Sequence, residues 1–305
     1  MPQRKPRYEI VVSAENNPYV AWQAMLFHYS CLKHTGHAPL VVVHGDTTER
    51  LVAGLQRLER HGGRIQRVPN FRLHRGFDYA PRNTPGTLRC VESDADYLVL
   101  CDPDMIFFGP GRFERHRLAE DQITLDRVPY MAVNGETRSY LSAACKRAGV
   151  SLKRLAREQL GGGVPHIVPI SLQPALSREW FRSLDFFFPV GTASRVRTLT
   201  GQPQISWLAG MWALIFAIHR LGLRPVKTQF ALSNFDGALT RLPPLDGNPF
   251  LIHYCYGDSV FNKREFYGAS GACANVWNVR ASDESVSGRI CREVAAATEF
   301  YGLGG

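Results

Sequence analysis

The 305 residues are 45% hydrophobic and 21% charged, which is the composition of an ordinary globular protein, and the formal net charge is +9. The seven cysteines include no CxxC pair, which argues against a zinc site and against a disulfide framework. The basic residues are dispersed along the chain without a dense basic block, which argues against a nucleic-acid partner. No Ser-, Gly- or Pro-rich linker divides the sequence, so we expect a single domain over residues 1–305.

The sequence shows no segment typical of secretion or membrane insertion. The basic N-terminal residues are followed by a short apolar run at 10–12, which is too short for a signal peptide. The longest apolar stretch, 207–218, is too short to span a bilayer and ends at His219 and Arg220. We therefore expect a cytoplasmic protein with no membrane partner.

The first seventy residues alternate between predicted strands and predicted helices. Strands are expected at 8–14, 40–44 and 64–68, and helices at 17–34 and 47–61. Asn17 and Pro18 supply a cap and a first-turn proline for the first helix. This β-α-β-α-β order implies a parallel sheet that is covered by helices.

The rest of the chain predicts more helix and loop. We expect a polar, irregular segment at 69–82, a helix at 84–92, a strand at 97–101 and a hairpin region at 105–135. A helical pair at 137–160, a Gly-rich turn at 161–163 and helices at 173–184 and 207–221 follow. The predicted fold class is therefore α/β, with a Rossmann-like, mostly parallel sheet and a loop- and helix-rich C-terminal portion.

Two carboxylates follow the strand expected at 97–101. In open α/β sheets the ligand crevice lies at the carboxyl ends of the strands, where Asp102 and Asp104 are placed. Oxygen ligands one residue apart can hold one Mn²⁺ or Mg²⁺ and leave room for substrate phosphates. Such a cation would stabilise a diphosphate leaving group as a Lewis acid. The alternative is an Asx turn that closes the strand.

A second apolar run, at 251–252, is followed directly by His253, so this side chain is also expected at the end of a buried strand. A neutral imidazole could complete the coordination of Mn²⁺, although a single histidine at a strand is often structural. Gly257 would let the backbone approach a phosphate, and Lys263 or Arg264 would act as a cationic clamp.

Three further segments have both a binding and a structural interpretation. The glycines at 161–163, followed by Pro165 and His166, form either a phosphate or acceptor loop or a helix terminator. Arg82 and Asn83 would contact a phosphate and a base or ribose, or else form a surface loop with a helix cap. Trp207 begins an aromatic face at helical spacing, which is a core face or a platform for a sugar.

Five segments, taken in order, resemble one family. They are 19–23 (YVAWQ), 100–107 (LCDPDMIF), 162–168 (GGVPHIV), 207–212 (WLAGMW) and 252–257 (IHYCYG). Together they resemble motifs of plant and algal hydroxyproline O-arabinosyltransferases and peptidyl-serine α-galactosyltransferases. The resemblance covers about residues 8–267, which is nearly the whole chain.

The resemblance implies a GT-A fold, a UDP-sugar donor, Mn²⁺ (or Mg²⁺) and transfer with retention of anomeric configuration. The transferred sugar would be arabinofuranose or galactose. The acceptor would be a hydroxyl of hydroxyproline, serine or a small natural product. Carried over residue by residue, Asp102, Asp104 and His253 are metal ligands and Asn83 lies in the nucleotide pocket.

We expect Asp104 and Lys263 at the catalytic centre, where Lys263 and the metal stabilise the diphosphate. The residues expected to bind the donor and its metal are Asp102, Asn83, Arg82, Gly257 and Lys263. The expected division places the nucleotide-sugar half at 8–110, the acceptor half with the metal-ligand strand at 111–270, and a C-terminal tail at 271–305.

The acceptor side departs from the family pattern. The residues expected there are Pro165, His166, Trp207, Gly210 and Asp258. Gly210 stands where the family motif W-V-x-E-M-Y has a glutamate, which Asp185, Asp236, Asp258 or Glu265 could replace. Two alternatives stay open: a non-catalytic protein that binds nucleotide-sugars or glycans, favoured by Gly210, and a nucleic-acid binder, favoured by the charge.

Overall fold

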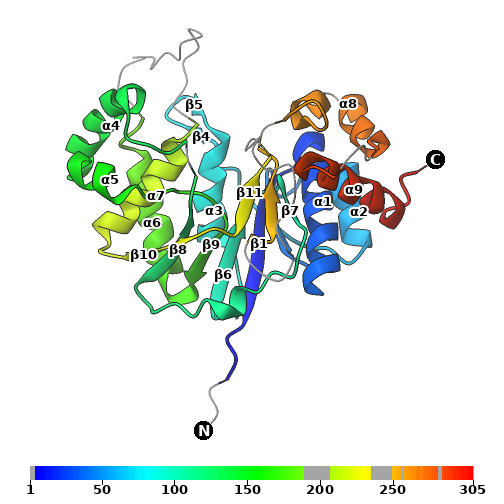
Figure 1. The fold of residues 1–305 in the computed structure, drawn as a ribbon, viewed down its shortest axis with the longest axis horizontal. Helices are drawn as coiled ribbons and strands as arrows, with labels where there is room; N and C mark the ends of the chain where they lie inside the picture. Colours follow the sequence, from blue (N-terminus) through cyan, green and yellow to red (C-terminus); the bar gives the residue numbers. More distant parts are fainter. Residues whose placement is uncertain are drawn as a thin grey trace. The chain divides into compact units, whose positions relative to one another are not determined.

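A computed structural model describes residues 4–128, 130–188, 207–234, 249–255, 257–268, 270–280 and 284–304. The chain forms two compact units (Figure 1), the first from residues 1–69, 99–116 and 229–305 and the second from 70–98 and 117–228. Among the helices described, none has the length and apolar character needed to cross a membrane. The expected functional division at 110/111 and 270/271 stays a prediction.

The first unit is built around parallel strands. Its elements are β1 (Tyr8–Glu15), α1 (Pro18–Thr35), β2 (Leu40–His44), α2 (Ala53–Arg60), β3 (Arg64–Val68), β7 (Met105–Phe107), β11 (Ala231–Ser233), β12 (Leu251–His253), α8 (Ser270–Ala274) and α9 (Val286–Phe300), together with the end of β6 (Tyr97–Cys101). The strand order is β3-β2-β1-β6, and β2 pairs in parallel with both β1 and β3. The predicted β-α-β-α-β start is therefore confirmed.

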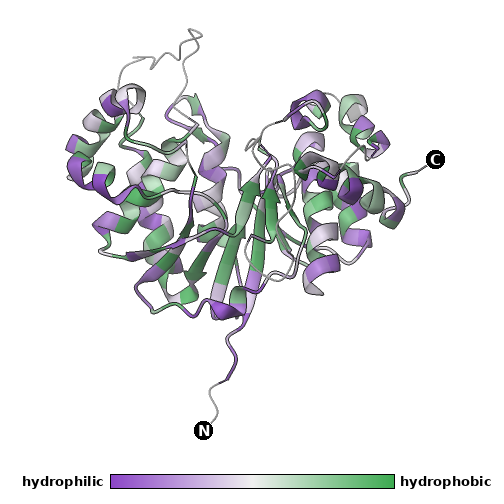
Figure 2. Cartoon of the chain, in the orientation of Figure 1, coloured by the Kyte–Doolittle hydropathy of each residue, from purple (hydrophilic) through white to green (hydrophobic). Residues whose placement is uncertain are grey.

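Sequence features explain why these elements form. All five residues of β2 are buried, as expected for an apolar strand inside a covered parallel sheet, and Figure 2 shows the strands as largely hydrophobic. The Asn17 side chain caps α1 by accepting the Val20 N–H at 2.9 Å. Gly36 ends the helix with a left-handed φ of 75°. The helix packs against α2, α9 and β7, so it forms the centre of this unit.

The helix predicted at 47–61 begins only at Ala53, so the first part of that prediction is wrong. Asp46 Oδ1 accepts the Thr48 N–H at 2.8 Å, and Asn16 Oδ1 accepts the Val52 N–H at 2.9 Å. These side-chain acceptors bind backbone donors that a helix would otherwise use, and they hold the segment in a turn.

The hairpin predicted at 105–135 is also wrong. Strand β7 pairs antiparallel with β12, more than a hundred residues later, and β12 pairs in parallel with β11. Strand β8 of the second unit pairs instead with β10. Both partners lie too far along the chain for a local pattern to indicate them.

The second unit is mainly helical. Its elements are β4 (Leu73–His74), β5 (Phe77–Asp78), α3 (Asn83–Cys90), the first two residues of β6, β8 (Gln122–Asp126), α4 (Gly135–Ala148), α5 (Leu152–Glu158), β9 (His166–Pro169), α6 (Gln173–Leu184), α7 (Ala209–Arg220) and β10 (Arg224–Thr228). The helices predicted at 84–92, 173–184 and 207–221 are confirmed within two residues, and the predicted pair at 137–160 is confirmed as α4 and α5. The α/β fold class, with a mostly parallel sheet flanked by helices, is thus confirmed.

One element of the second unit was missed. Strands β4 and β5 form a short antiparallel hairpin inside the segment expected to be irregular. Arg75 and Gly76 make its two-residue turn, and both have positive φ, 51° and 80°. Arginine rarely adopts that conformation, so the sequence pattern did not indicate a turn here.

Glu293 of α9 gives a test of what stabilises the first unit. Its side chain is only 1% exposed and lies 3.0 Å from Lys33 Nζ and 2.8 Å from Arg289 Nη2. Burial alone would raise the pKa of Glu293, but hydrogen bonds from His34 and Lys33 and the charge of Arg289 lower it. We predict that Glu293→Gln reduces the free energy of unfolding at neutral pH by about 1–3 kcal/mol.

The pH dependence follows from the lowered pKa. The stabilisation is fully present above the unfolded value of 4.5 and is lost as the pH falls through the folded pKa, so the two proteins should converge in acid. Urea unfolding at neutral and acidic pH measures this difference. As a control, Glu284→Gln removes a carboxylate whose side chain is 89% exposed and should change stability by less than about 0.5 kcal/mol. Equal losses in the two variants would contradict the prediction.

Candidate metal centre

The pairing of β7 with β12 brings three potential ligands together. Strand β6 ends at Cys101, and Asp102 and Asp104 lie in the turn that leads into β7. The register places Met105 opposite His253, and the Tyr254 N–H donates to the Asp104 carbonyl at 3.0 Å. Two residues separated by 149 positions, Asp104 and His253, thereby become neighbours.

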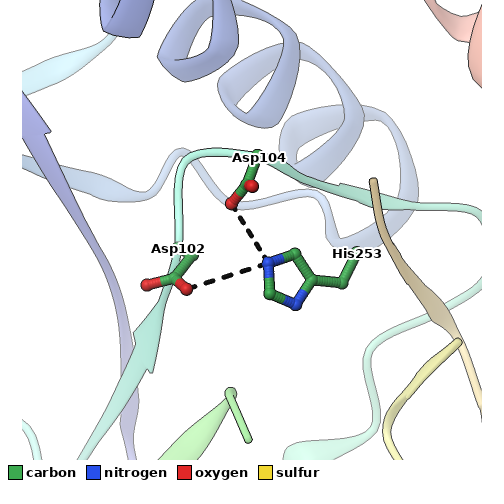
Figure 3. A group of neighbouring side chains, drawn as sticks. All are labelled: Asp102, Asp104 and His253. Atoms are coloured by element: carbon green, nitrogen blue, oxygen red, sulfur yellow. Dashed lines mark hydrogen bonds and ion pairs between the residues drawn. The ribbon is translucent and has the colours of Figure 1, made fainter. Parts of the chain in front are cut away.

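The three side chains converge on one point (Figure 3). His253 Nε2 lies 3.2 Å from Asp104 Oδ1 and 3.8 Å from Asp102 Oδ2. Potential ligand atoms of all three residues lie within 4.8 Å of one another. Oxygen ligands of an octahedral Mg²⁺ at about 2.1 Å lie up to about 4.2 Å apart. The three ligand atoms would therefore need to move only slightly closer together to bind one cation. The donor set of two carboxylates and one imidazole fits a divalent cation.

Lys263 adds a positive charge to this cluster. Its ammonium group donates to Asp104 Oδ2, and its side chain is largely buried. Burial by itself would raise the pKa of Asp104 and lower that of Lys263. The attraction between the two groups outweighs burial, so the pKa of Asp104 is lowered and that of Lys263 is raised. The same balance, with Asp104 as the partner, raises the pKa of His253.

Asp102 behaves in the opposite way. Burial and the negative charge of Asp104 raise its pKa to about 6. Lys263 and His253 thus favour the charged form of Asp104. The charged form of Asp102 is disfavoured, because its pKa is raised. A cation that bound here would compete with the Lys263 ammonium group for Asp104, and it would bind His253 only through an unprotonated ring nitrogen.

The loop that carries Lys263 is closed by Asp258. The Asp258 Oδ1 atom accepts the N–H groups of Val260 at 2.8 Å and Phe261 at 2.9 Å, and Ser287 Oγ of α9 donates to Oδ2 at 2.6 Å. With its oxygens occupied in this way, Asp258 has a role in positioning the loop that the sequence did not indicate.

Gly257 lies in the same loop and is bridged to Asn262. A Cβ at this position would lie 2.5 Å from Asn262 atoms, so the close backbone approach requires glycine. The structure therefore explains Gly257 by contact within the loop.

Tyr254 was also missed by the sequence analysis. It is fully buried, and its ring stacks on Trp22 of α1 with 6.0 Å between centroids. Its backbone N–H donates to the Asp104 carbonyl. Tyr254 therefore fixes the turn that contains Asp102 and Asp104 next to His253. The alternation of apolar and polar residues at 252–255 is the signal that could have indicated this inward-facing side chain.

The other expected donor-site residues, Arg82 and Asn83, lie in the second unit. Asn83 is buried and accepts the Phe71 N–H at 2.8 Å. Arg82 donates to the Phe71 carbonyl at 2.8 Å and lies over the Phe181 ring at 4.7 Å. Both side chains therefore support the segment at 70–72, and their role toward a nucleotide stays a prediction.

Three of the expected acceptor residues have contrasting surroundings. Pro165 and His166 are buried, and His166 Nδ1 lies 3.2 Å from the Thr124 carbonyl. Burial lowers the pKa of His166 to about 4, so this imidazole is neutral at physiological pH. Trp207, by contrast, is 69% exposed.

Gly210 lies under the hydroxyl group of Tyr79. The Gly210 N–H donates to Tyr79 Oη at 2.8 Å, and Tyr79 Oη donates to the Trp207 carbonyl at 2.8 Å. A Cβ at position 210 would lie 3.2 Å from that hydroxyl oxygen. Glycine at position 210 therefore lets the Tyr79 hydroxyl lie close to the start of α7.

The proposed replacements for that carboxylate differ in their surroundings. Asp185 accepts from His74 at 2.7 Å and lies 3.5 Å from Arg75, within the second unit. Glu265 is exposed in the first unit. Asp236 lies outside the described residues.

Comparison with known proteins identifies the fold. No family model matches the chain, and a search of curated proteins finds no match. The chain is similar to the apo structure of the bifunctional glycosyltransferase WbbM, with 13% identity and a TM-score of 0.54 over 99% of this chain. It spans only 52% of WbbM. It is also similar to an active-site mutant of LgtC, with 11% identity and a TM-score of 0.53 over 95% of each chain. The α/β fold is that of the GT-A glycosyltransferases.

Removal of the Asp258 carboxylate tests its positioning role. We predict that Asp258→Ala lowers the free energy of unfolding by about 1–3 kcal/mol, because three donors lose their acceptor. Asp258→Asn keeps one acceptor oxygen and should recover part of the loss. Glu265→Gln, an exposed change nearby in the chain, serves as the control. Urea denaturation distinguishes these outcomes, and wild-type stability of Asp258→Ala would rule the role out.

Proposed function

We propose that the chain is a metal-dependent glycosyltransferase that moves a sugar from a UDP-sugar to a hydroxyl acceptor. The observation that carries this proposal is the cluster of Asp102, Asp104 and His253, with Lys263 bound to Asp104. The GT-A fold shared with WbbM and LgtC supports it, because WbbM is described as a bifunctional glycosyltransferase and LgtC as a protein with an active site.

The residues of the cluster have distinct proposed roles. Asp102, Asp104 and His253 would hold the cation, and the mixed oxygen and nitrogen donors favour Mn²⁺ over Mg²⁺, which prefers oxygen. When bound, the cation would supply positive charge to the departing diphosphate. Lys263, displaced from Asp104, would pair with a diphosphate oxygen through a charge-assisted hydrogen bond.

The proposed reaction exchanges one C–O bond for another. The bond between the anomeric carbon and the diphosphate oxygen breaks, and a bond to the acceptor oxygen forms on the same face of the sugar. The acceptor proton passes to the departing diphosphate. The resemblance of five ordered segments to hydroxyproline O-arabinosyltransferases and peptidyl-serine α-galactosyltransferases supports retention. It favours arabinofuranose or galactose as the sugar and a peptide or small-molecule hydroxyl as the acceptor.

The remaining expected residues complete the proposed site. Arg82 and Asn83 are proposed nucleotide contacts, and Gly257 shapes the loop before Lys263. On the acceptor side the exposed indole of Trp207 is the group most accessible to a ligand. Asp258, Pro165 and His166 would act by shaping their segments.

Asp104→Asn tests the metal assignment directly. We predict that this variant binds Mn²⁺ at least about 100-fold more weakly, since it loses the charged ligand that His253 and Lys263 face. Titration calorimetry with Mn²⁺ alone measures the loss without any turnover. Metal-dependent UDP release should disappear in parallel. Asp121→Asn, which alters an exposed carboxylate paired with Arg224, should leave both unchanged. Undiminished Mn²⁺ binding by Asp104→Asn would refute the site.

Lys263→Met separates the lysine from the metal ligands. The substitution removes a cation that competes for Asp104, so Mn²⁺ alone should bind as tightly as to the wild type or more tightly. UDP in the presence of Mn²⁺ should bind about 10- to 100-fold more weakly, because a charge-assisted hydrogen bond is lost. Calorimetry of the two ligands gives both numbers. A fall in Mn²⁺ affinity comparable to that of Asp104→Asn would contradict this separation of roles.

A second candidate function is a non-catalytic protein that binds nucleotide-sugars or glycans. Gly210 favours it, because the motif that the chain resembles has a glutamate at this position, and here the neutral Tyr79 hydroxyl lies against Gly210. Thermal shifts with a panel of UDP-sugars and Mn²⁺ measure binding, and UDP release measures turnover. Stabilisation without consumption of any donor across the panel would select this second function.

A further inference from the structure

The net positive charge belongs almost entirely to the second unit. Residues 70–98 and 117–228 contain 19 Lys and Arg against 11 Asp and Glu, a net charge of +8. The remainder contains 17 against 16, a net charge of +1. Among the described residues alone, the second unit contains 17 Lys and Arg against 11 Asp and Glu, a net charge of +6, and the first unit contains 16 against 13, a net charge of +3. The basic residues are therefore enriched in the second unit, where their field attracts anions.

Within this unit, cations gather on two consecutive helices. We define the α4–α5 basic surface as the following exposed residues: Arg138, Lys146, Arg147, Lys153, Arg154 and Arg157. Figure 2 shows hydrophilic turns along both helices. Arg154 pairs with Glu158, and Arg147 donates to backbone carbonyls. Arg138, Lys146, Lys153 and Arg157 make no ion pair with a described residue.

Complementarity to the helix dipole explains only part of this surface. Lys146 and Arg157 lie in the last turns of α4 and α5, where cations are favoured. Arg138 lies in the first turn of α4, and Lys153 lies in the first turn of α5, which contains no acidic residue. The dipole disfavours cations at those two positions, so it does not account for them.

The spacing of the charges indicates an extended partner. Arg138 and Lys146 are separated by eight residues, or about 12 Å along the helix axis, which a single phosphate group cannot span. The large hydrophobic side chains that are exposed among the described residues include no aromatic on α4 or α5. These helices therefore present no exposed aromatic side chain on which the bases of a single-stranded nucleic acid could stack. Lipids of a fluid bilayer can rearrange beneath irregularly spaced cations, whereas the phosphates of a duplex are fixed.

We propose that the α4–α5 basic surface docks on an anionic membrane surface. This proposal differs from the expectation of no membrane partner, which rested on the lack of a signal peptide and of a membrane-spanning segment in the sequence. The docking goes beyond the proposed function, and vesicle binding is measured without donor or cation.

The experiment measures partition of the protein onto phosphatidylcholine vesicles with and without phosphatidylglycerol. We expect binding only to the anionic vesicles, with weakening as salt is raised. The triple variant Arg138→Gln, Lys153→Gln, Arg157→Gln should partition about 100-fold less, at about fivefold per removed charge. The control triple variant Arg50→Gln, Arg57→Gln, Arg60→Gln changes the net charge equally in the first unit and should retain binding.

Melting temperatures and Mn²⁺ titrations of both variants show whether folding and the metal cluster are intact, which keeps this test separate from the proposed function. If the first triple variant is unstable, the single variant Lys153→Gln should still lose about fivefold. Three results would overturn the proposal: no binding to anionic vesicles, equal losses in the two triple variants, or binding to duplex DNA without binding to vesicles.

Discussion

The antiparallel pairing of β7 with β12 is the contact on which the candidate site depends. It joins two strands that lie more than a hundred residues apart in the chain and places His253 opposite Met105, beside Asp104. Because side chains alternate between faces, a slip of one residue would turn His253 away from both aspartates. The Phe108 N–H donates to the Phe250 carbonyl at 3.0 Å, and the Tyr254 N–H donates to the Asp104 carbonyl at the other end of the pair. These bonds fix the register on both sides of the ligand.

The cluster is built so that protons, the lysine ammonium group and a metal ion would compete for the same carboxylate oxygens. Lys263 and His253 stabilise Asp104 in its charged form, which keeps a buried anion from being left unpaired. The fold can therefore form before any cation binds. The same arrangement implies that cation affinity reflects the difference between two sets of favourable contacts.

The sequence predicts what depends on local pattern and misses what depends on distant contacts. The strand before Asp102, the capped helix after Asn17 and the helix at 173–184 follow from apolar periodicity and caps, and the structure confirms them. The late start of α2 depends on Asn16, and the loop role of Asp258 depends on Ser287 of another helix. The charge of the second unit shows the same limit, since linear spacing conceals how folding gathers side chains.

The hydroxyl group of Tyr79 links two positions that are far apart in the chain. It accepts the Gly210 N–H in the first turn of α7, a donor that a capping side chain would otherwise satisfy, and it donates to the Trp207 carbonyl just before the helix. A larger side chain at position 210 would meet this hydroxyl, and loss of the hydroxyl would leave those groups without a partner. Positions 79 and 210 are thus energetically coupled, and their substitutions should not be additive. Because a Cβ at position 210 would lie 3.2 Å from the Tyr79 hydroxyl, a side chain there would require the Tyr79 ring to shift slightly, and the helix start and the Tyr79 ring are therefore adjusted to each other.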